Sequence, residues 1–397
     1  MAESYKQETE TISKEDREEV EDAFKKGGVA GLQNLLMSKR EEWKTIPVNI
    51  AITGESGVGK STLINTLRNL TADHKEGANA NVKEATKKVN RYEHPDNKNI
   101  VFWDLPGVGT PKFPKDEYLE TVAFDRYDFF LVLVVGRCRE ADMWLCGEVK
   151  KRGKKFYYVR TQMHLEVLKD SLSHPRTHDK KKVIQTIRDD CFENLEKAKL
   201  PSDRIFLIDS YEVHDTDFDF DQLSTLIIDE LPNEKREALT VSMTVLTRGI
   251  IERKKDILQS RIYKVAALSA VGGAVPIPGV NAMFDAALVK AEIEEYRKQF
   301  GFTSNTHIGQ SRCGFIQSFA FDTSPASLAH YIANFATDEE NVSKMKLSIG
   351  IRIIGSIAGA AVSYGKTVLV LRRILDMFAE DVYKVSEEIV NTFAPSM

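Results

Sequence analysis

The residues most able to do chemistry lie in one short loop with the pattern Gly-x-x-x-x-Gly-Lys-Ser. Its members are Gly54, Glu55, Ser56, Gly57, Val58, Gly59, Lys60 and Ser61. Glycines let a backbone wrap around a polyphosphate with its amides pointing inward. In this pattern the lysine reaches the outer phosphates and the serine hydroxyl binds magnesium. The sequence therefore predicts a site for a nucleoside triphosphate with Mg²⁺.

The segments on either side of this loop fit the motif. Residues 48–53 form an apolar run typical of a short buried strand, and residues 61–69 have the apolar spacing of a helix. A helix that starts directly after the loop adds its dipole and its free amides to phosphate binding. We therefore extend the predicted nucleotide contacts to Thr62.

A second motif, Asp104-Leu105-Pro106-Gly107, follows a strand predicted at 99–104. In P-loop enzymes such an aspartate holds magnesium, usually through water, and the glycine amide contacts the terminal phosphate. The polar segment between the two motifs contains Glu84 and Thr86, and Thr86 is predicted to close on magnesium as a switch residue. A plain loop threonine is the other interpretation. The predicted magnesium ligands are thus Ser61, Thr86 and Asp104.

Together, these motifs resemble those of the immunity-related GTPases, the interferon-inducible, dynamin-like family that attacks pathogen-containing vacuoles. The resemblance rests on residues 53–62, on 103–110, on Tyr127-Asp128-Phe129-Phe130 and on Phe156-Tyr157-Tyr158-Val159-Arg160-Thr161. It implies a Ras-like P-loop GTPase domain, an all-helical domain formed by both chain ends, nucleotide-dependent oligomers and peripheral membrane targeting.

One segment departs from the family pattern. Most GTPases end the fifth strand with Thr/Asn-Lys-x-Asp, whose carboxylate accepts two hydrogen bonds from guanine, whereas this chain has Thr161, Gln162, Met163 and His164. A neutral imidazole offers one acceptor, so it cannot reproduce that pairing. We carry over Thr161, Gln162, His164 and the more distant Ser210 as nucleotide contacts. Glu166 or Asp170 could substitute if the loop reorganises, with an ordinary solvated loop as the alternative.

Hydrolysis is a separate question from binding. Ras-like enzymes orient the attacking water with a glutamine directly after Asp-x-x-Gly, and here that position is Val108. The resemblance implies low intrinsic turnover that rises on self-assembly. Catalytic roles are predicted for Lys60, Thr86 and Glu84, the carboxylate nearest to Thr86. A plain solvated glutamate is an equal alternative for Glu84.

The chain of 397 residues is long enough for two or three domains, and a net charge of −4 argues against broad nucleic-acid binding. Strands are predicted at 48–53, 87–93, 99–104, 128–135, 155–160 and 204–209, and helices at 61–69, 140–152, 180–198 and 220–230. This alternation predicts an α/β fold with a mainly parallel sheet. The predicted parts are an N-terminal helical segment (1–45), a P-loop GTPase domain (46–232) and a C-terminal helical domain (233–397).

Two apolar stretches, 265–284 and 353–365, contain no charged residue. The first is as long as a membrane span, but the glycines and prolines in its middle fit a helical hairpin better. Core packing, conditional membrane contact and a true span stay open. The polar N-terminus, beginning Met1-Ala2, predicts no secretory signal, and Ala2 stands where N-myristoylation needs glycine.

The sequence thus predicts a cytoplasmic GTP-binding and GTP-hydrolysing enzyme that assembles with nucleotide and acts peripherally on intracellular or pathogen-containing membranes. Its predicted partners are GTP and GDP, further copies bound through the GTPase domain, and related GTPases in mixed dimers. The alternative is a non-hydrolysing or base-relaxed nucleotide-binding regulator of true GTPases.

Overall fold

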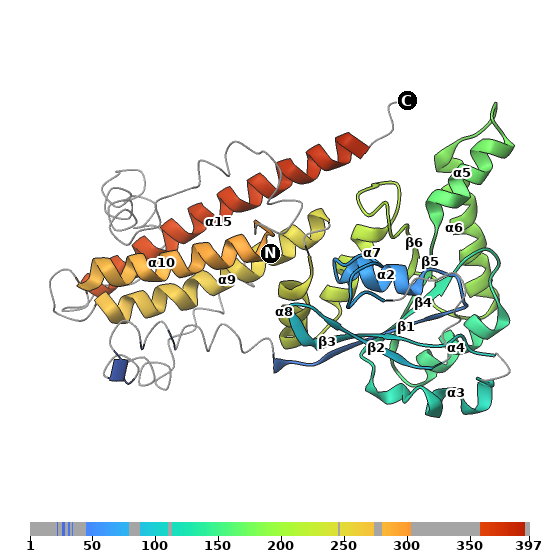
Figure 1. The fold of residues 1–397 in the computed structure, drawn as a ribbon, viewed down its shortest axis with the longest axis horizontal. Helices are drawn as coiled ribbons and strands as arrows, with labels where there is room; N and C mark the ends of the chain where they lie inside the picture. The colour runs from blue at the N-terminus through green and yellow to red at the C-terminus, as the bar shows by residue number, and fades with distance from the viewer. Residues whose placement is uncertain are drawn as a thin grey trace. The chain divides into compact units, whose positions relative to one another are not determined.

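The computed structural model describes residues 45–78, 88–109, 113–244, 247–273, 280–302 and 358–393, with a few isolated positions before residue 45. The chain divides into two compact units, one containing Trp43–Arg253 and the other containing Lys254–Val385. The first unit holds a sheet with helices on it, and the second is built of long helices (Figure 1).

The sheet has six strands in the order β2-β3-β1-β4-β5-β6. They span Val48–Gly54 (β1), Asn90–His94 (β2), Asn97–Asp104 (β3), Phe129–Val134 (β4), Lys155–Arg160 (β5) and Ile205–Leu207 (β6). Only β2 runs antiparallel to its neighbour, β3, and the other pairs are parallel. The predicted α/β class with a mainly parallel sheet is confirmed. The parallel strands bring the carboxyl ends of β1 and β3 to the same edge.

Successive residues of the central strands point to opposite faces of the sheet, and each face is covered by helices. In β4, Leu131 and Leu133 belong to one apolar cluster, while Val132 and Val134 belong to the other. The first cluster includes residues of α2 (Lys60–Leu67), α7 (Phe220–Asp229) and α8 (Asn233–Ser242). The second includes residues of α3 (Lys115–Thr121), α4 (Glu140–Lys151) and α6 (Lys180–Lys197). Continuous apolar runs in the strands are therefore buried on both sides, as a parallel sheet requires.

The four helices predicted within 46–232 are present as α2, α4, α6 and α7, and the described residues of this range contain two further α-helices that were not predicted. One is α3, and the other is α5 (Met163–Ser173), which occupies a stretch interpreted as an ordinary loop. In α5, Met163 is fully buried, whereas Leu165, Leu168 and Leu172 are exposed. The loop interpretation was wrong, because the spacing of Leu165, Leu168 and Leu172 places them on one face of a helix.

The second unit contains α9 (Arg248–Gly273, from Lys254 onward), α10 (Val280–Gln299) and α15 (Ala358–Phe393). Buried polar pairs join α9 and α10 along their length. Lys254 Nζ donates to Gln299 Oε1 at 3.0 Å, and Ser269 Oγ donates to Asp285 Oδ1 at 2.6 Å. Because each buried polar group needs a partner, these pairs favour a single antiparallel register of the two helices.

The apolar stretch 265–284 is shared between two helices, since α9 ends at Gly273 and α10 begins at Val280. Its described side chains Val265, Ala266 and Ser269 are buried in the helical unit. Within the described residues, no helix combines the length and the apolar character that a membrane span needs. Of the stretch 353–365, residues before 358 and nearly all the side chains lie outside the described part.

The domain boundary at 232/233 stays a prediction. Helix α8 begins at Asn233, and its Ala238 and Leu239 belong to the same apolar cluster as Ile50 of β1 and Phe102 of β3. The N-terminal segment 1–45 lies outside the described residues apart from Thr45 and the isolated positions.

Candidate nucleotide-binding site

The loop between β1 and α2 has the backbone of a phosphate-binding loop. Gly54 ends β1 so close to β4 that a Cβ there would lie 2.2 Å from Leu133 O. Gly59 has φ 92°, in the left-handed region, directly before the first residue of α2. Glycine is required at both positions for these two different reasons. The amides at the start of α2 therefore face the loop, where an anion is favoured.

The side chain of Lys60 folds back over this loop. Its Nζ donates to Gly54 O at 2.9 Å and to Glu55 O at 2.8 Å, and the residue is only 5% exposed. Burial lowers the pKa of Lys60, while the carboxylates of Asp104 and Glu55 act in the opposite direction. The ammonium is therefore held by two carbonyl groups and two acidic neighbours, in the position from which it can reach phosphate oxygens.

Asp104 ends β3 beside this loop. It pairs with Ile52 of the parallel strand β1, and the next residue, Leu105, donates its amide to Ile52 O at 2.9 Å. Asp104 is 2% exposed. Gly107 approaches the loop closely, since a Cβ there would lie 3.2 Å from Gly54 O. The two motifs of the sequence are thus adjacent in space.

The residues present fit a magnesium ion held partly by phosphate. Ser61, in the first turn of α2, and the buried carboxylate of Asp104 both offer oxygen, the ligand type that Mg²⁺ prefers. Among the described residues, no cluster of three or more His, Cys, Asp or Glu side chains could hold a metal alone. The predicted residues Glu84 and Thr86 lie outside the described part of the chain.

Tyr118 of α3 ties the two motifs together, and sequence reasoning missed it. Its hydroxyl donates to Pro106 O at 2.8 Å and lies 3.1 Å from Thr53 Oγ1, so the threonine is the donor in that second bond. Burial raises the pKa of Tyr118. The neutral hydroxyl therefore links the end of β1 to the Asp-x-x-Gly segment. No local pattern marks this role, because the partners are distant in sequence.

An acidic residue of α4 faces the same loop. Asp142 is 8% exposed, and burial raises its pKa to about 6, although the positive charges of Arg139 and Lys60 act against this rise. Glu55 adds to the rise and is itself paired with Arg139. The loop therefore carries a buried carboxyl group that is mostly ionised at neutral pH, although its burial makes the charged form less stable than it would be in the unfolded chain.

Replacing Asp142 with asparagine is expected to stabilise the protein at pH 7.5 by about 1–3 kcal/mol. The folded-state pKa of about 6 exceeds the ordinary value of 3.8, so the folded chain binds the extra proton between these values. Stability thus falls as pH rises through this window, and the full penalty applies above it. Urea unfolding at pH 7.5 and pH 4 measures the difference, which should vanish at pH 4. An equal gain from the exposed control Glu196→Gln, or a gain that persists at pH 4, would contradict this.

The base-recognition segment contacts the phosphate-binding loop directly. Thr161 Oγ1 donates to Val58 O at 2.7 Å, and Gln162 Nε2 donates to Gly57 O at 2.7 Å. Gln162 has φ 59°, a left-handed backbone directly before α5. Two side chains of this segment therefore hold the loop, although the lysine and aspartate of the usual motif are absent.

His164 and Ser210 lie on two neighbouring segments at the same edge of the sheet. The side chain of His164 is exposed, and its backbone amide donates to Asp209 Oδ2 at 3.1 Å. Ser210 is held through its carbonyl oxygen, which accepts from Thr66 Oγ1 of α2 at 2.9 Å. Asp209, which the sequence analysis did not select, connects these segments.

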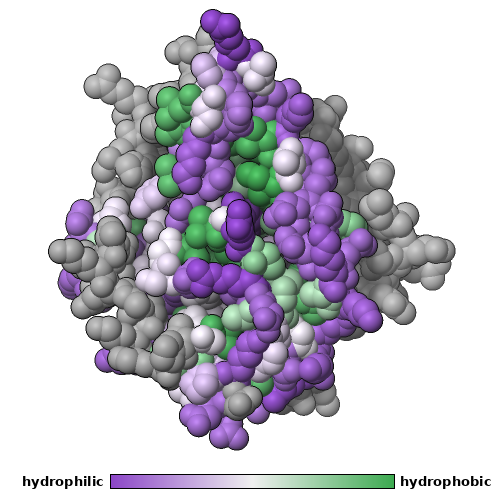
Figure 2. All heavy atoms as spheres, turned by 90° about the vertical axis from the view of Figure 1, so that its right-hand side faces the viewer, coloured by the Kyte–Doolittle hydropathy of each residue, from purple (hydrophilic) through white to green (hydrophobic). Residues whose placement is uncertain are grey.

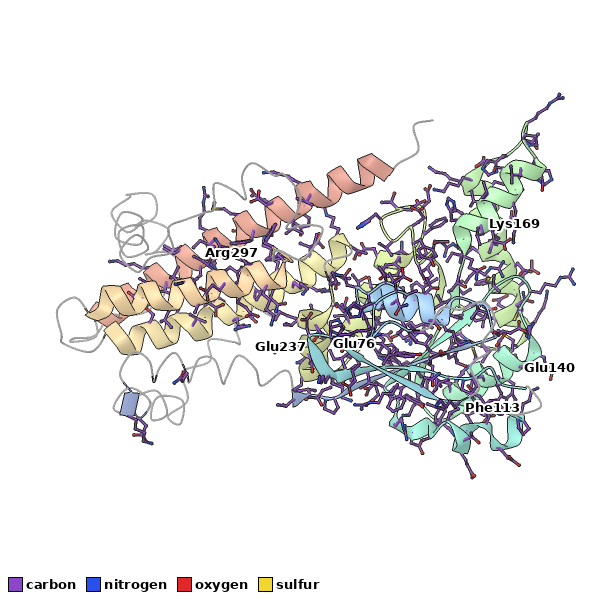
Figure 3. All side chains as sticks on the ribbon, viewed as in Figure 1. Glu76, Phe113, Glu140, Lys169, Glu237 and Arg297 are labelled. Atoms are coloured by element: carbon purple, nitrogen blue, oxygen red, sulfur yellow. The ribbon has the colours of Figure 1, made fainter. Side chains whose placement is uncertain are left out.

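Glu166 and Asp170, considered above as substitute carboxylates on a loop, lie on helix α5 with partners of their own. Glu166 accepts from Lys169 at 3.2 Å, and Lys169 is labelled on α5 in Figure 3. Asp170 lies 2.9 Å from His174 Nδ1 and 2.7 Å from His178 Nδ1. This segment is therefore a helix and not a loop that could reorganise around the base.

Val108, directly after the Asp-x-x-Gly motif, is 8% exposed and belongs to the apolar cluster that contains Ala51, Leu105 and Tyr118. A buried valine has no group that can orient water. Any water-orienting group therefore comes from another part of the site.

The fold and the loop geometry define the class: a P-loop nucleotide-binding domain of the Ras-like type. The family model of the interferon-inducible GTPases matches residues 13–389. Three relatives are similar over much of their length. Interferon-gamma-inducible GTPase 10 of Mus musculus is 33% identical over 86% of this chain and 73% of its own. Interferon-inducible GTPase 5 of Rattus norvegicus is 31% identical over 94% of this chain and 82% of its own. Interferon-inducible GTPase 1 of Mus musculus is 32% identical over 73% of this chain and 70% of its own.

The chain belongs to the interferon-inducible GTPase family, a class of GTP hydrolases. This confirms the resemblance identified from the motifs, the fold class and the assignment to GTP-hydrolysing enzymes.

Proposed function

We propose that this chain binds GTP with Mg²⁺ in the β1–α2 loop and hydrolyses it slowly alone and faster on self-association. The observation that carries the proposal is the buried Lys60 folded over the loop, with the carboxylate of Asp104 beside it. The backbone from Gly54 to Thr62 holds the phosphates, and Gly107 contacts the terminal phosphate. Thr161, Gln162, His164 and Ser210 are proposed to surround the base.

Ser61 and Asp104 are proposed to hold Mg²⁺, with Thr86 joining them when the switch segment closes. The ion, when bound, would supply positive charge against the negative charge of the phosphate oxygens. Lys60 adds a second positive charge at the same phosphates. Because Val108 is buried, the attacking water is proposed to be oriented by Glu84, by Thr86 or by groups of a second copy.

Self-association through the GTPase domain is supported by the surface of α5. Leu165, Leu168 and Leu172 are 46%, 44% and 74% exposed, spaced by three and four residues along one helix. Side chains at this spacing share a helix face. Figure 2 shows the side of the molecule at the right of Figure 1, where hydrophobic patches interrupt a hydrophilic surface. Exposed apolar surface of this kind is typical of interaction sites.

The cellular part of the proposal follows from family membership. We infer that the chain works in the cytoplasm, contacts intracellular or pathogen-containing membranes peripherally, and takes part in cell-autonomous defence, also through mixed dimers with related GTPases. The division into parts 1–45, 46–232 and 233–397 belongs to the same proposal.

A second candidate function is a non-hydrolysing or base-relaxed regulator that acts through mixed dimers with true GTPases. The buried Val108 and the exposed His164 favour it, since neither supplies the usual water or base contact. It shares the phosphate contacts of the main proposal, so turnover separates the two.

Turnover per molecule is expected to rise at least about fivefold as the concentration of the wild-type protein increases, because assembly completes the site. Leu172→Glu should flatten this rise by placing a charge on the apolar face of α5. Phosphate release measured across protein concentration, with sedimentation on the same samples, tests both points. Phe192→Glu, at an exposed apolar residue of α6, is the matched control and should behave as wild type. Turnover that is absent at every concentration would favour the regulator instead.

A further inference from the structure

We propose that Asp209 supplies the carboxylate that reads the hydrogen-bonding edge of guanine in this chain, in place of a residue at position 164. This inference rests on the proposed function, since it requires a nucleotide whose base lies at the segments that follow β5 and β6. It assigns base specificity to a residue on the segment after β6, whereas the sequence motif points to the segment after β5.

Asp209 lies between the two segments that border the base. It follows β6, whose Leu207 pairs with Arg160 at the end of the parallel strand β5. Its Oδ2 accepts from the amide of His164 at 3.1 Å, and its Oδ1 accepts from the amide of Tyr211 at 3.0 Å. One carboxylate therefore joins the segment after β5 to the segment after β6.

The Asp209 carboxylate lies close to the position from which a base-binding aspartate usually projects. The amide nitrogen that Oδ2 contacts is bonded to the Cα of His164, from which a side chain at this position projects. Asp209 therefore presents its oxygen atoms within a few ångströms of the place where the usual aspartate would begin. His164 itself is exposed, and Tyr211 is 82% exposed, so the two residues whose amides hold this carboxylate lie at the surface.

Asp209 also has unused hydrogen-bonding capacity. A carboxylate can accept about four hydrogen bonds, and two backbone amides provide two of them. The residue is only 5% exposed, and the partners of its carboxylate among the described residues are these two amides, not a cation. A buried carboxylate without a cation is costly unless further donors satisfy it. A ligand edge with two N–H groups would complete this set.

Guanine offers such an edge, because its N1–H and its 2-amino group are adjacent donors. Xanthine has a carbonyl oxygen in place of the 2-amino group, so a carboxylate repels it there. An amide in place of the carboxylate can donate one hydrogen bond to that carbonyl and accept one from N1–H. Exchange of the carboxylate for an amide should therefore change the preferred base, which a purely structural role of Asp209 would not do.

The test is calorimetric titration of the full chain with GDP and with XDP, for the wild type and for Asp209→Asn. The wild type should prefer GDP by at least about tenfold. In Asp209→Asn the affinity for GDP should fall by about 10- to 100-fold, and the affinity for XDP should rise. A gain of XDP binding cannot come from unfolding, so the result stays interpretable if the variant is less stable. Glu212→Gln, in the same segment, is the matched control and should keep the wild-type preference.

Two results would overturn the inference while leaving the proposed function intact. One is equal loss of both ligands in Asp209→Asn, which would make the residue a structural link. The other is a wild type that binds GDP and XDP equally. A wild type that binds neither nucleotide, with or without Mg²⁺, would instead overturn the proposed function itself.

Discussion

Replacement of Lys60 with alanine is expected to weaken binding of Mg²⁺-GTP by at least about 100-fold. The ammonium lies over the loop and donates to two of its carbonyl groups, and hydrogen bonds to charged groups contribute about 1.5–3 kcal/mol each, with 1.4 kcal/mol per tenfold change in affinity. The fold should survive Lys60→Ala. The variant loses the hydrogen bonds to Gly54 O and Glu55 O, but it also removes a buried charge, and the lowered pKa of Lys60 shows that burying this charge is unfavourable. The net change in stability should stay within about 1 kcal/mol.

Calorimetry of Lys60→Ala with Mg²⁺-GTP measures the effect, and thermal unfolding without nucleotide checks the fold. In the wild type, saturating nucleotide should raise the melting temperature, because a ligand that binds only the native state stabilises it. Lys60→Ala should lose this rise. Lys75→Ala, at an exposed lysine of the same unit, is the control and should keep it. Affinity within threefold of the wild type would show that Lys60 does not contact phosphate.

Gly54→Ala is expected to destabilise the sheet unit by about 3–5 kcal/mol. A Cβ at this position would lie 2.2 Å from Leu133 O and 3.1 Å from Val58 Cγ2, and φ is 142°. Unfavourable backbone angles cost about 1–3 kcal/mol, and overpacking of a rigid neighbour costs a similar amount. Because the contact is with backbone, the side chain cannot relieve it by rotation.

Gly57→Ala separates the two causes, because Gly57 has φ 83° but no atom lies within 4 Å of a Cβ there. The free energy of unfolding of Gly57→Ala should fall by only about 1–2 kcal/mol, which is the cost of the unfavourable backbone angles alone. Urea unfolding followed by tryptophan fluorescence gives both values. Equal stability of the two variants would mean that the approach of β4 to Gly54 is not a constraint.

The strands and the phosphate-binding loop were predictable because their signals are local. The apolar run before Gly54 and the alternation of strands and helices give β1 and the parallel sheet within a few residues of their observed bounds. The predicted ends differ most at the edge strand β2, which begins at Asn90 and was predicted from 87. Edge strands have one neighbour each, so their limits depend more on that pairing than on their own sequence.

The missing parts of the site depend on contacts between distant residues. Tyr118 joins Thr53 to Pro106, and Asp209 accepts from the amide of His164, and none of these pairings is visible in a local pattern. Helix α5 is different, since the spacing of its leucines is a local helical pattern, and the loop interpretation rested on the departure of this segment from the base-recognition motif. Asp142 was missed because its raised pKa comes first from burial and then from the negative charge of Glu55, and neither is visible in the sequence around Asp142.

The central claim is that the β1–α2 loop binds a nucleoside triphosphate and that the edge of the sheet beyond β5 and β6 selects guanine. Calorimetric titration of the wild-type chain with GTP, ATP and XTP, each with and without Mg²⁺, tests it most directly. We expect GTP to bind most tightly, by at least tenfold over ATP and XTP, and to bind more tightly with Mg²⁺ than without it. Equal affinities for the three nucleotides would contradict the guanine selection, and absence of binding would contradict the whole account.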